Sequence, residues 1–243
     1  MIIESIKDPR FIYLSEQVAL MTDDTPGKIT KHSCELLAHL LEAHGFDKYR
    51  KADRVCIKKC NEFTFEVSFG TNYKNNERGK FVELNVYALV RSKIIADHCK
   101  GLNWYWANEG LGGGQLGNLV KPHSWLTWDL SKPERRPKDI GSAYNRIQKI
   151  AFPYFENFEN AKQLTERFDL EYVIDVDPNA QLQMIMYYFG VERAKEVAEK
   201  FLSRHPEIHD EYLEKLNYFA DPSAVPSGFR TQAHMLAYLA KRL

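Results

Sequence analysis

The residues best suited to chemistry lie in one stretch, residues 101–137, which is rich in glycine, tryptophan and proline. His123 lies there with two carboxylates, Asp129 and Glu109. An imidazole and a carboxylate held close together can move a proton to or from a substrate. No Ser or Cys nucleophile motif such as G-x-S-x-G accompanies them. These three residues are our acid/base candidates should the chain be a small hydrolase or transferase.

Residues 112–117 match the dinucleotide-binding pattern G-x-G-x-x-G. That pattern needs an apolar strand before it and, after it, a helix whose N-terminus holds a pyrophosphate. Here residues 103–109 read NWYWANE, and Pro122 follows too soon for an ordinary helix. We therefore expect a flexible or tightly turned loop beside a sheet edge, and no cofactor.

All four tryptophans fall in the same stretch, at positions 104, 106, 125 and 128. Indole rings are favoured at binding surfaces because they are largely apolar yet donate a hydrogen bond. The alternative is that they fill the open end of a sheet where regular elements are missing. If one of them is exposed beside the glycines, we expect the contact surface there. The predicted binding residues are Trp104, Trp106, Gly113, Gly114, Gln115 and Trp125.

The charge and composition of the chain limit the classes of partner that it is expected to bind. The 33 basic and 33 acidic residues cancel, so no overall field draws the chain to nucleic acid or to an anionic membrane. No apolar run approaches the roughly 20 residues that span a bilayer. The N-terminus does not resemble a secretory signal, and four cysteines fit a reducing compartment, so we expect a cytoplasmic protein.

The sequence predicts no metal site. Cys56 and Cys60 would lie about 13 Å apart on an extended strand, and no second Cys/His pair is nearby. His205 and His209 resemble a zinc-binding helix motif in spacing alone. Because Pro206 is expected to begin the helix, their two imidazoles need not share a face.

The elements that must position these residues follow from the hydrophobic periodicity. Residues 54–60, 62–71 and 80–90 are strand candidates; in the second, Phe63, Phe65 and Val67 alternate with polar residues. This period of two is typical of an antiparallel sheet with one buried face. We expect Lys58 on the polar face, paired with Glu66 and Glu83.

Helical spacing appears on both sides of these strands, and Gly45 is expected to cap the helix 28–44. The further expected elements are an amphipathic stretch 11–21, a polar loop 74–79, a short helix 92–100, a fourth strand 125–130, and helices 139–151, 158–168, 180–188, 191–205, 207–219 and 231–243. The prediction is an α+β fold: a small antiparallel β-sheet of three to five strands packed by helices (residues 1–168), followed by an α-helical C-terminal section (169–243) docked on it.

Part of this order resembles a known family. A helix ending in His44-Gly45-Phe46 precedes the alternating strands, followed by the turn 113–117 and by the helix that reaches residues 150–155 (IAFPYF). Over roughly residues 28–168 this pattern is similar to the bacterial domain-of-unknown-function family 4304. The resemblance implies an α+β fold with an antiparallel sheet, and it brings no activity and no catalytic residues.

Two functions remain open from the sequence. One is a non-catalytic bacterial interaction protein, such as a toxin-neutralising (immunity-type) protein, which rests on the clustered tryptophans, the absence of a catalytic set and the abundant charge of both signs. The other is the small hydrolase or transferase that uses His123 and Asp129. Whether the chain is an enzyme stays undecided; the expected partner is a protein, not nucleic acid or a membrane.

Overall fold

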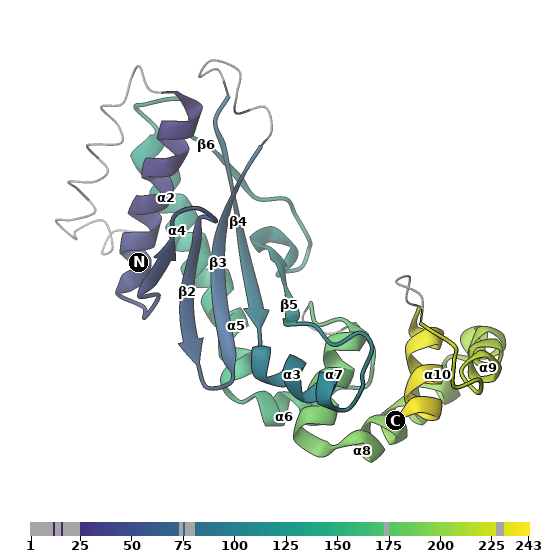
Figure 1. Cartoon of the computed structure of the whole chain (residues 1–243). Helices are drawn as coiled ribbons and strands as arrows, with labels where there is room; N and C mark the ends of the chain where they lie inside the picture. The colour runs from purple at the N-terminus through teal and green to yellow at the C-terminus, as the bar shows by residue number, and fades with distance from the viewer. Residues whose placement is uncertain are drawn as a thin grey trace. The chain divides into compact units, whose positions relative to one another are not determined.

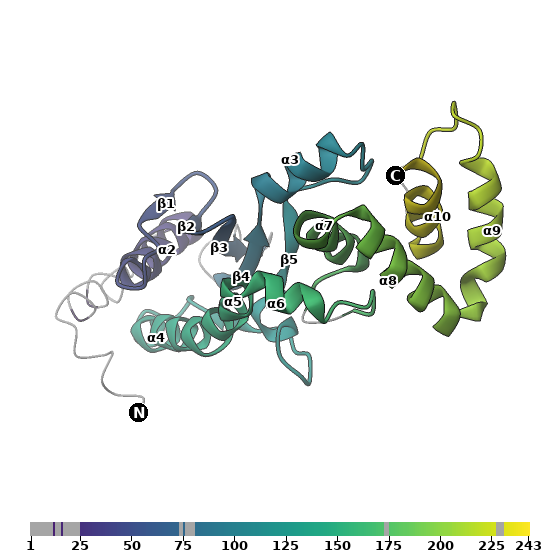
Figure 2. The same ribbon diagram turned by 90° about the horizontal axis from the view of Figure 1, so that it is seen from below.

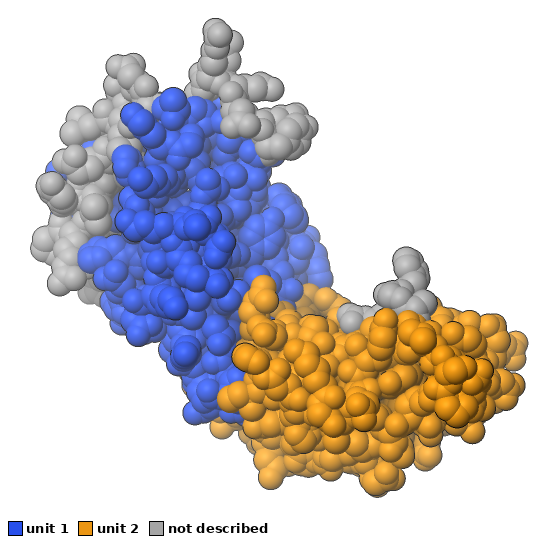
Figure 3. All heavy atoms as spheres, in the orientation of Figure 1, with its two compact units in different colours: residues 1–90, 113–156 blue, residues 91–112, 157–243 orange. Residues whose placement is uncertain are grey.

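The computed structural model describes residues 12, 16, 25–72, 75, 81–172, 175–226 and 231–243. The expected stretch 11–21 and loop 74–79 therefore lie outside the described residues, apart from Ile12, Glu16 and Asn75. The chain divides into two compact units, coloured in Figure 3. We call residues 1–90 and 113–156 the sheet unit, and residues 91–112 and 157–243 the helical unit. The segment 91–112 thus groups with the C-terminal helices, whereas the sequence suggested one boundary at residue 168.

The strands form one sheet, in the order β1-β2-β3-β4-β5, with β6 also paired to β4 (Figure 1). Their bounds are β1 Lys48–Arg50, β2 Val55–Cys60, β3 Phe63–Thr71, β4 Glu83–Arg91, β5 Gly110–Gln115 and β6 Thr127–Asp129. Strand β1 pairs antiparallel with β2, β2 with β3, and β4 with β6. The α+β prediction is confirmed, and β6 lies inside the expected strand 125–130. The short strand β1 and the glycine-rich strand β5 were not predicted.

One face of the sheet is covered by helices. They are α2 (Pro26–Glu42), α4 (Arg136–Arg146), the π-helical turn η4 (Ile147–Ala151) and α5 (Phe152–Glu159). Figure 2 shows α2, α4 and α5 on the same side of the strands. Phe65 of β3 stacks on Phe155 of α5, with ring centroids 4.8 Å apart. Gly45 has the left-handed φ of +82° that we expected, and the amide of Phe46 donates to the carbonyl oxygen of Leu41.

The polar face of the sheet differs from our expectation at strand β2. Lys58 pairs in register with Phe65, and Cys56 with Val67, so both residues share the face that the helices cover. The turn after β2 decides this register, because Cys60 pairs with Phe63 across Asn61, whose φ is +52°. The expected pairing of Lys58 with Glu66 was therefore wrong. Arg50 of β1 lies 3.6 Å from the Glu66 carboxylate instead.

The described residues of the helical unit form seven short helices, three of which begin with a side-chain cap. They are α3 (Lys93–Gly101), α6 (Ala161–Glu166), α7 (Pro178–Phe189), α8 (Val191–Arg204), η5 (Pro206–Ile208), α9 (His209–Tyr218) and α10 (Gln232–Arg242). Ser92, Asp177 and Thr231 each accept an amide hydrogen bond at the start of α3, α7 and α10. Within the described residues, no helix is long and apolar enough to cross a bilayer.

We predict that Gly113→Ala destabilises the sheet unit by about 3 kcal/mol. Gly113 has a φ of +114°, and an added Cβ would lie 2.1 Å from the carbonyl oxygen of Ala88 on β4. Gly114→Ala is the matched control, because an added Cβ there meets nothing within 4 Å. Urea denaturation of both variants checks this. Equal midpoints for the two variants would contradict it.

Candidate functional site

The first candidate site is the loop after β5. We call residues 117–126 the Trp125 loop. Its ends are tied by Gln115, which is buried: the side-chain oxygen accepts from the amide of Gly117 at 2.7 Å, and the side-chain nitrogen donates to the carbonyl oxygen of Leu126. The amide of Ser124 also donates to the carbonyl oxygen of Gly117 at 3.0 Å. One side chain thus fixes both ends of the loop.

Two glycines within residues 112–117 allow close approach of the backbone: Gly117, the last glycine of the G-x-G-x-x-G match, and Gly113, which occupies a variable position of that pattern. A Cβ at Gly117 would lie 1.7 Å from the carbonyl oxygen of Ser124, so another residue cannot close the loop this way. Gly113 approaches β4 in the same manner. After β5 comes only a three-residue 3-10 turn, Leu116–Asn118, where a dinucleotide site requires a helix. The expected loop was therefore wrong for residues 112–115, which belong to strand β5, and the tight turn begins only at Leu116.

Trp125 presents its side chain to solvent. The residue is 59% exposed, and its ring meets the ring of Tyr87 edge-on at 6.3 Å between centroids. Residues 120–125 are all exposed, and the loop contains Lys121 and His123 but no acidic residue. This satisfies the condition set from the sequence, an exposed tryptophan beside the glycines.

The other predicted tryptophans are buried. Trp104 and Trp106, which belong to the helical unit, are 2% and 7% exposed, and their rings pack edge-on with Tyr238. The Trp104 indole donates to the Asn179 side chain at 3.0 Å. These two rings therefore form part of the helical unit's core, and they are neither an exposed contact surface nor a filling of the open end of the sheet.

The three acid/base candidates are not assembled into one group. His123 is exposed and has no hydrogen-bond partner among the described residues. The Asp129 carboxylate accepts from the amide of Ser131 at 2.9 Å, and Glu109 belongs to the helical unit. The geometry therefore offers no support for the hydrolase or transferase.

The buried thiols are also poor nucleophiles. Burial raises the pKa of Cys34, Cys56 and Cys99 to about 12, because an apolar interior disfavours the thiolate. These raised pKa values agree with thiols that have a structural role.

No protein-family model matches this chain, and no curated protein or solved structure matches it significantly. The resemblance to family 4304 therefore stays a prediction.

Sequence reasoning missed a pocket in the helical unit, which has a volume of about 410 Å³. It is lined by two carboxylates, an aromatic ring, two amides and a thioether: Glu171, Asp177, Tyr172, Asn179, Gln232 and Met235. Ligand sites commonly have volumes of this order and a few convergent polar groups.

Gln181 of α7, which is fully buried, holds the loop that carries Glu171 and Tyr172. Its side-chain oxygen accepts from the amide of Leu170 at 2.9 Å, and its nitrogen donates to the carbonyl oxygens of Glu171 and Val176. Leu170 has a φ of +69°, a conformation that bulky residues rarely adopt. The Gln181 contacts offset that strain and fix the wall of the pocket.

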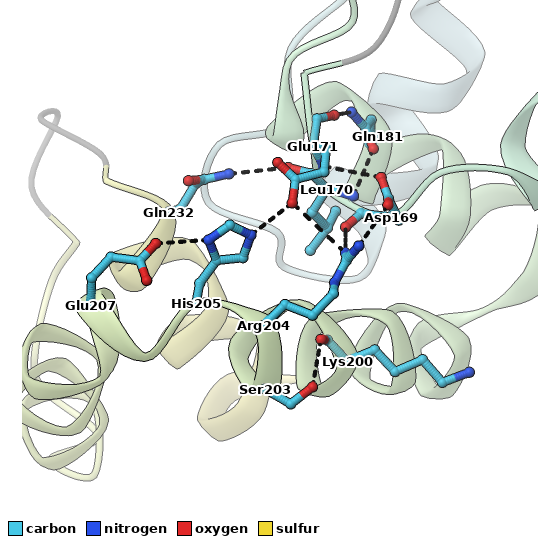
Figure 4. Close-up of polar contacts among 10 residues, drawn as sticks. All are labelled: Asp169, Leu170, Glu171, Gln181, Lys200, Ser203, Arg204, His205, Glu207 and Gln232. Atoms are coloured by element: carbon cyan, nitrogen blue, oxygen red, sulfur yellow. Dashed lines mark hydrogen bonds and ion pairs between the residues drawn. The ribbon is translucent and has the colours of Figure 1, made fainter.

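Behind Glu171 lies a cluster of charged side chains, drawn in Figure 4. The two ring nitrogens of His205 lie 2.7 Å from carboxylate oxygens of Glu171 and Glu207. Arg204 donates to the Asp169 carboxylate at 3.0 Å and lies 3.9 Å from Glu171. Both ring nitrogens can donate at once only when the imidazole is protonated. Hydrogen bonds to Glu171 and then Glu207 accordingly raise the pKa of His205.

No sequence signal pointed to this pocket, because its described lining residues come from two distant parts of the chain, residues 171, 172 and 177–179 and residues 232 and 235. The spacing of His205 and Glu207 was visible, but Glu171 is 34 residues from His205.

We predict that Trp125→Phe removes most of the tryptophan emission that acrylamide quenches. The other three indoles are at most 7% exposed, so Trp125 dominates collisions with the quencher. Trp128→Phe is the control in the same unit and should leave the quenchable emission intact. A Stern–Volmer slope unchanged in Trp125→Phe would contradict the exposure of this ring.

We predict that His205 stabilises the fold more at low pH than at high pH. Because its folded-state pKa is raised, the contribution is complete below the unfolded value of about 6.5 and is lost as pH rises through the folded value. The difference in urea midpoint between wild type and His205→Gln should therefore be largest at about pH 6 and shrink as the pH rises through the folded-state pKa. A difference that grows with pH would contradict this assignment.

Proposed function

We propose that this chain is a non-catalytic protein-interaction protein that binds its partner through the Trp125 loop. The observation that carries the proposal is the 59% exposure of Trp125 on a loop tied at both ends by Gln115. A large exposed indole is a common anchor of protein interfaces. Since the loop is already held in place, binding costs little further ordering of its backbone.

The loop indicates the chemistry of the partner. Lys121 adds positive charge to the loop, His123 adds a second polar ring, and the loop has no carboxylate. The complementary surface is an apolar pocket that receives the indole, with acidic residues at its rim. The partner is therefore expected to be a protein with an acidic face.

In its biological role, we propose a cytoplasmic bacterial protein that neutralises a partner such as a toxin. A neutraliser needs a rigid surface that blocks its target and no catalytic set of its own. The fixed Trp125 loop and the dispersed acid/base candidates are consistent with such a role.

The proposal predicts that Trp125→Ala loses the partner. Wild-type protein, Trp125→Ala and Tyr105→Ala, all tagged, are used to capture proteins from extracts of the source cells and are compared by quantitative mass spectrometry. Tyr105, an aromatic residue 48% exposed in the helical unit, is the matched control. Truncating an anchor of this kind typically weakens binding at least about 30-fold, which calorimetry with the purified partner would measure.

Two results would contradict the proposal. One is a stoichiometric partner that binds Trp125→Ala as tightly as wild type. The other is the absence of any protein partner together with a small molecule that copurifies with the chain, which would favour an enzyme.

A further inference from the structure

The pocket of the helical unit has features that select for positive charge. Glu171 and Asp177 contribute two carboxylates to its wall, and none of its described lining residues is Lys or Arg. The Tyr172 ring also lines it, and aromatic faces attract cations within about 6 Å. Met235 adds an apolar surface for a short hydrocarbon chain.

Glu171 has one carboxylate oxygen available to accept a hydrogen bond from a ligand. Its contacts with Arg204 and His205 are both made by Oε1, and Oε2 has no hydrogen-bond partner among the described residues. Arg204 is engaged mainly by Asp169, through both its carboxylate and its carbonyl oxygen. The neighbouring cations therefore orient Glu171 without occupying both of its oxygens.

The amides that line the pocket are held in place by neighbours. Asn179, 1% exposed, accepts from the Trp104 indole and donates to the carbonyl oxygen of Trp106. Gln232 donates to the carbonyl oxygen of Leu170 at 3.1 Å. The Asn179 amide is thus fully engaged within the protein and shapes the pocket, whereas Gln232, among the described residues, uses only its side-chain nitrogen and keeps an oxygen that can accept from a ligand.

We propose that this pocket binds an alkylammonium group, carried either by a free amine or by a lysine side chain. The ammonium would donate to Glu171 over the face of Tyr172, and its alkyl chain would lie against Met235. This inference rests on the helical unit alone and is independent of the Trp125 loop.

The first test is calorimetry of the full chain with n-butylammonium chloride at constant ionic strength. We expect saturable binding with one site per chain, and none with n-butanol or butyrate, which have the same chain length without the positive charge. Absence of butylammonium binding, or equal binding of butanol, would overturn the proposal.

Variants then separate the pocket wall from the charged cluster behind it. Glu171→Gln should weaken butylammonium binding about tenfold, the usual effect of losing a charge-assisted hydrogen bond. Glu207→Gln is the matched control, because Glu207 also contacts His205 but does not line the pocket. Equal losses in both variants would overturn the direct contact with Glu171.

Tyr172→Ala gives a test that does not disturb the cluster. This residue is 65% exposed, so the variant should fold normally and weaken binding about threefold through loss of the ring face. Unchanged binding would remove Tyr172 from the site. Putrescine and N-acetyl-lysine methylamide, compared as competitors of butylammonium, distinguish a free amine from a lysine side chain, and failure of both to compete would overturn the proposal.

Discussion

Backbone amides and carbonyls that are buried outside helices and strands need partners, since an unpaired one costs about 1–3 kcal/mol. In this protein, side-chain amides supply many of them. Gln115 binds backbone groups of Gly117 and Leu126, and Gln181 binds those of Leu170, Glu171 and Val176. The irregular segments are thus fixed by single buried side chains in place of a ladder of strand hydrogen bonds.

These side-chain hydrogen bonds hold in place the two candidate surfaces, the Trp125 loop and the pocket of the helical unit. The Trp125 loop has its ends tied by Gln115, and one wall of the pocket is held by Gln181. Each surface presents an aromatic residue to solvent, Trp125 in the sheet unit and Tyr172 in the helical unit. Their charges differ, because the Trp125 loop has no carboxylate whereas the pocket wall has two. The two surfaces therefore suit different ligand chemistries.

Glycine plays a different part from the one its pattern suggested. A G-x-G-x-x-G match can mark a phosphate site, but here Gly117 of the match and Gly113 inside it are needed because backbone carbonyls lie where a Cβ would be. The same glycine spacing binds a dinucleotide phosphate only where a helix follows it.

The sequence by itself determined the α+β class, the strands β2 to β4 and most helices, because periodicity of two or of 3.6 records which face is buried. It also gathered all four tryptophans into residues 101–137 but did not tell the exposed one from the buried ones. Tertiary structure decided the rest. Strand register placed Lys58 opposite Phe65, packing buried Trp104 and exposed Trp125, and long-range contacts brought Glu171 to His205. Such outcomes depend on contacts between residues distant in sequence, which local patterns do not encode.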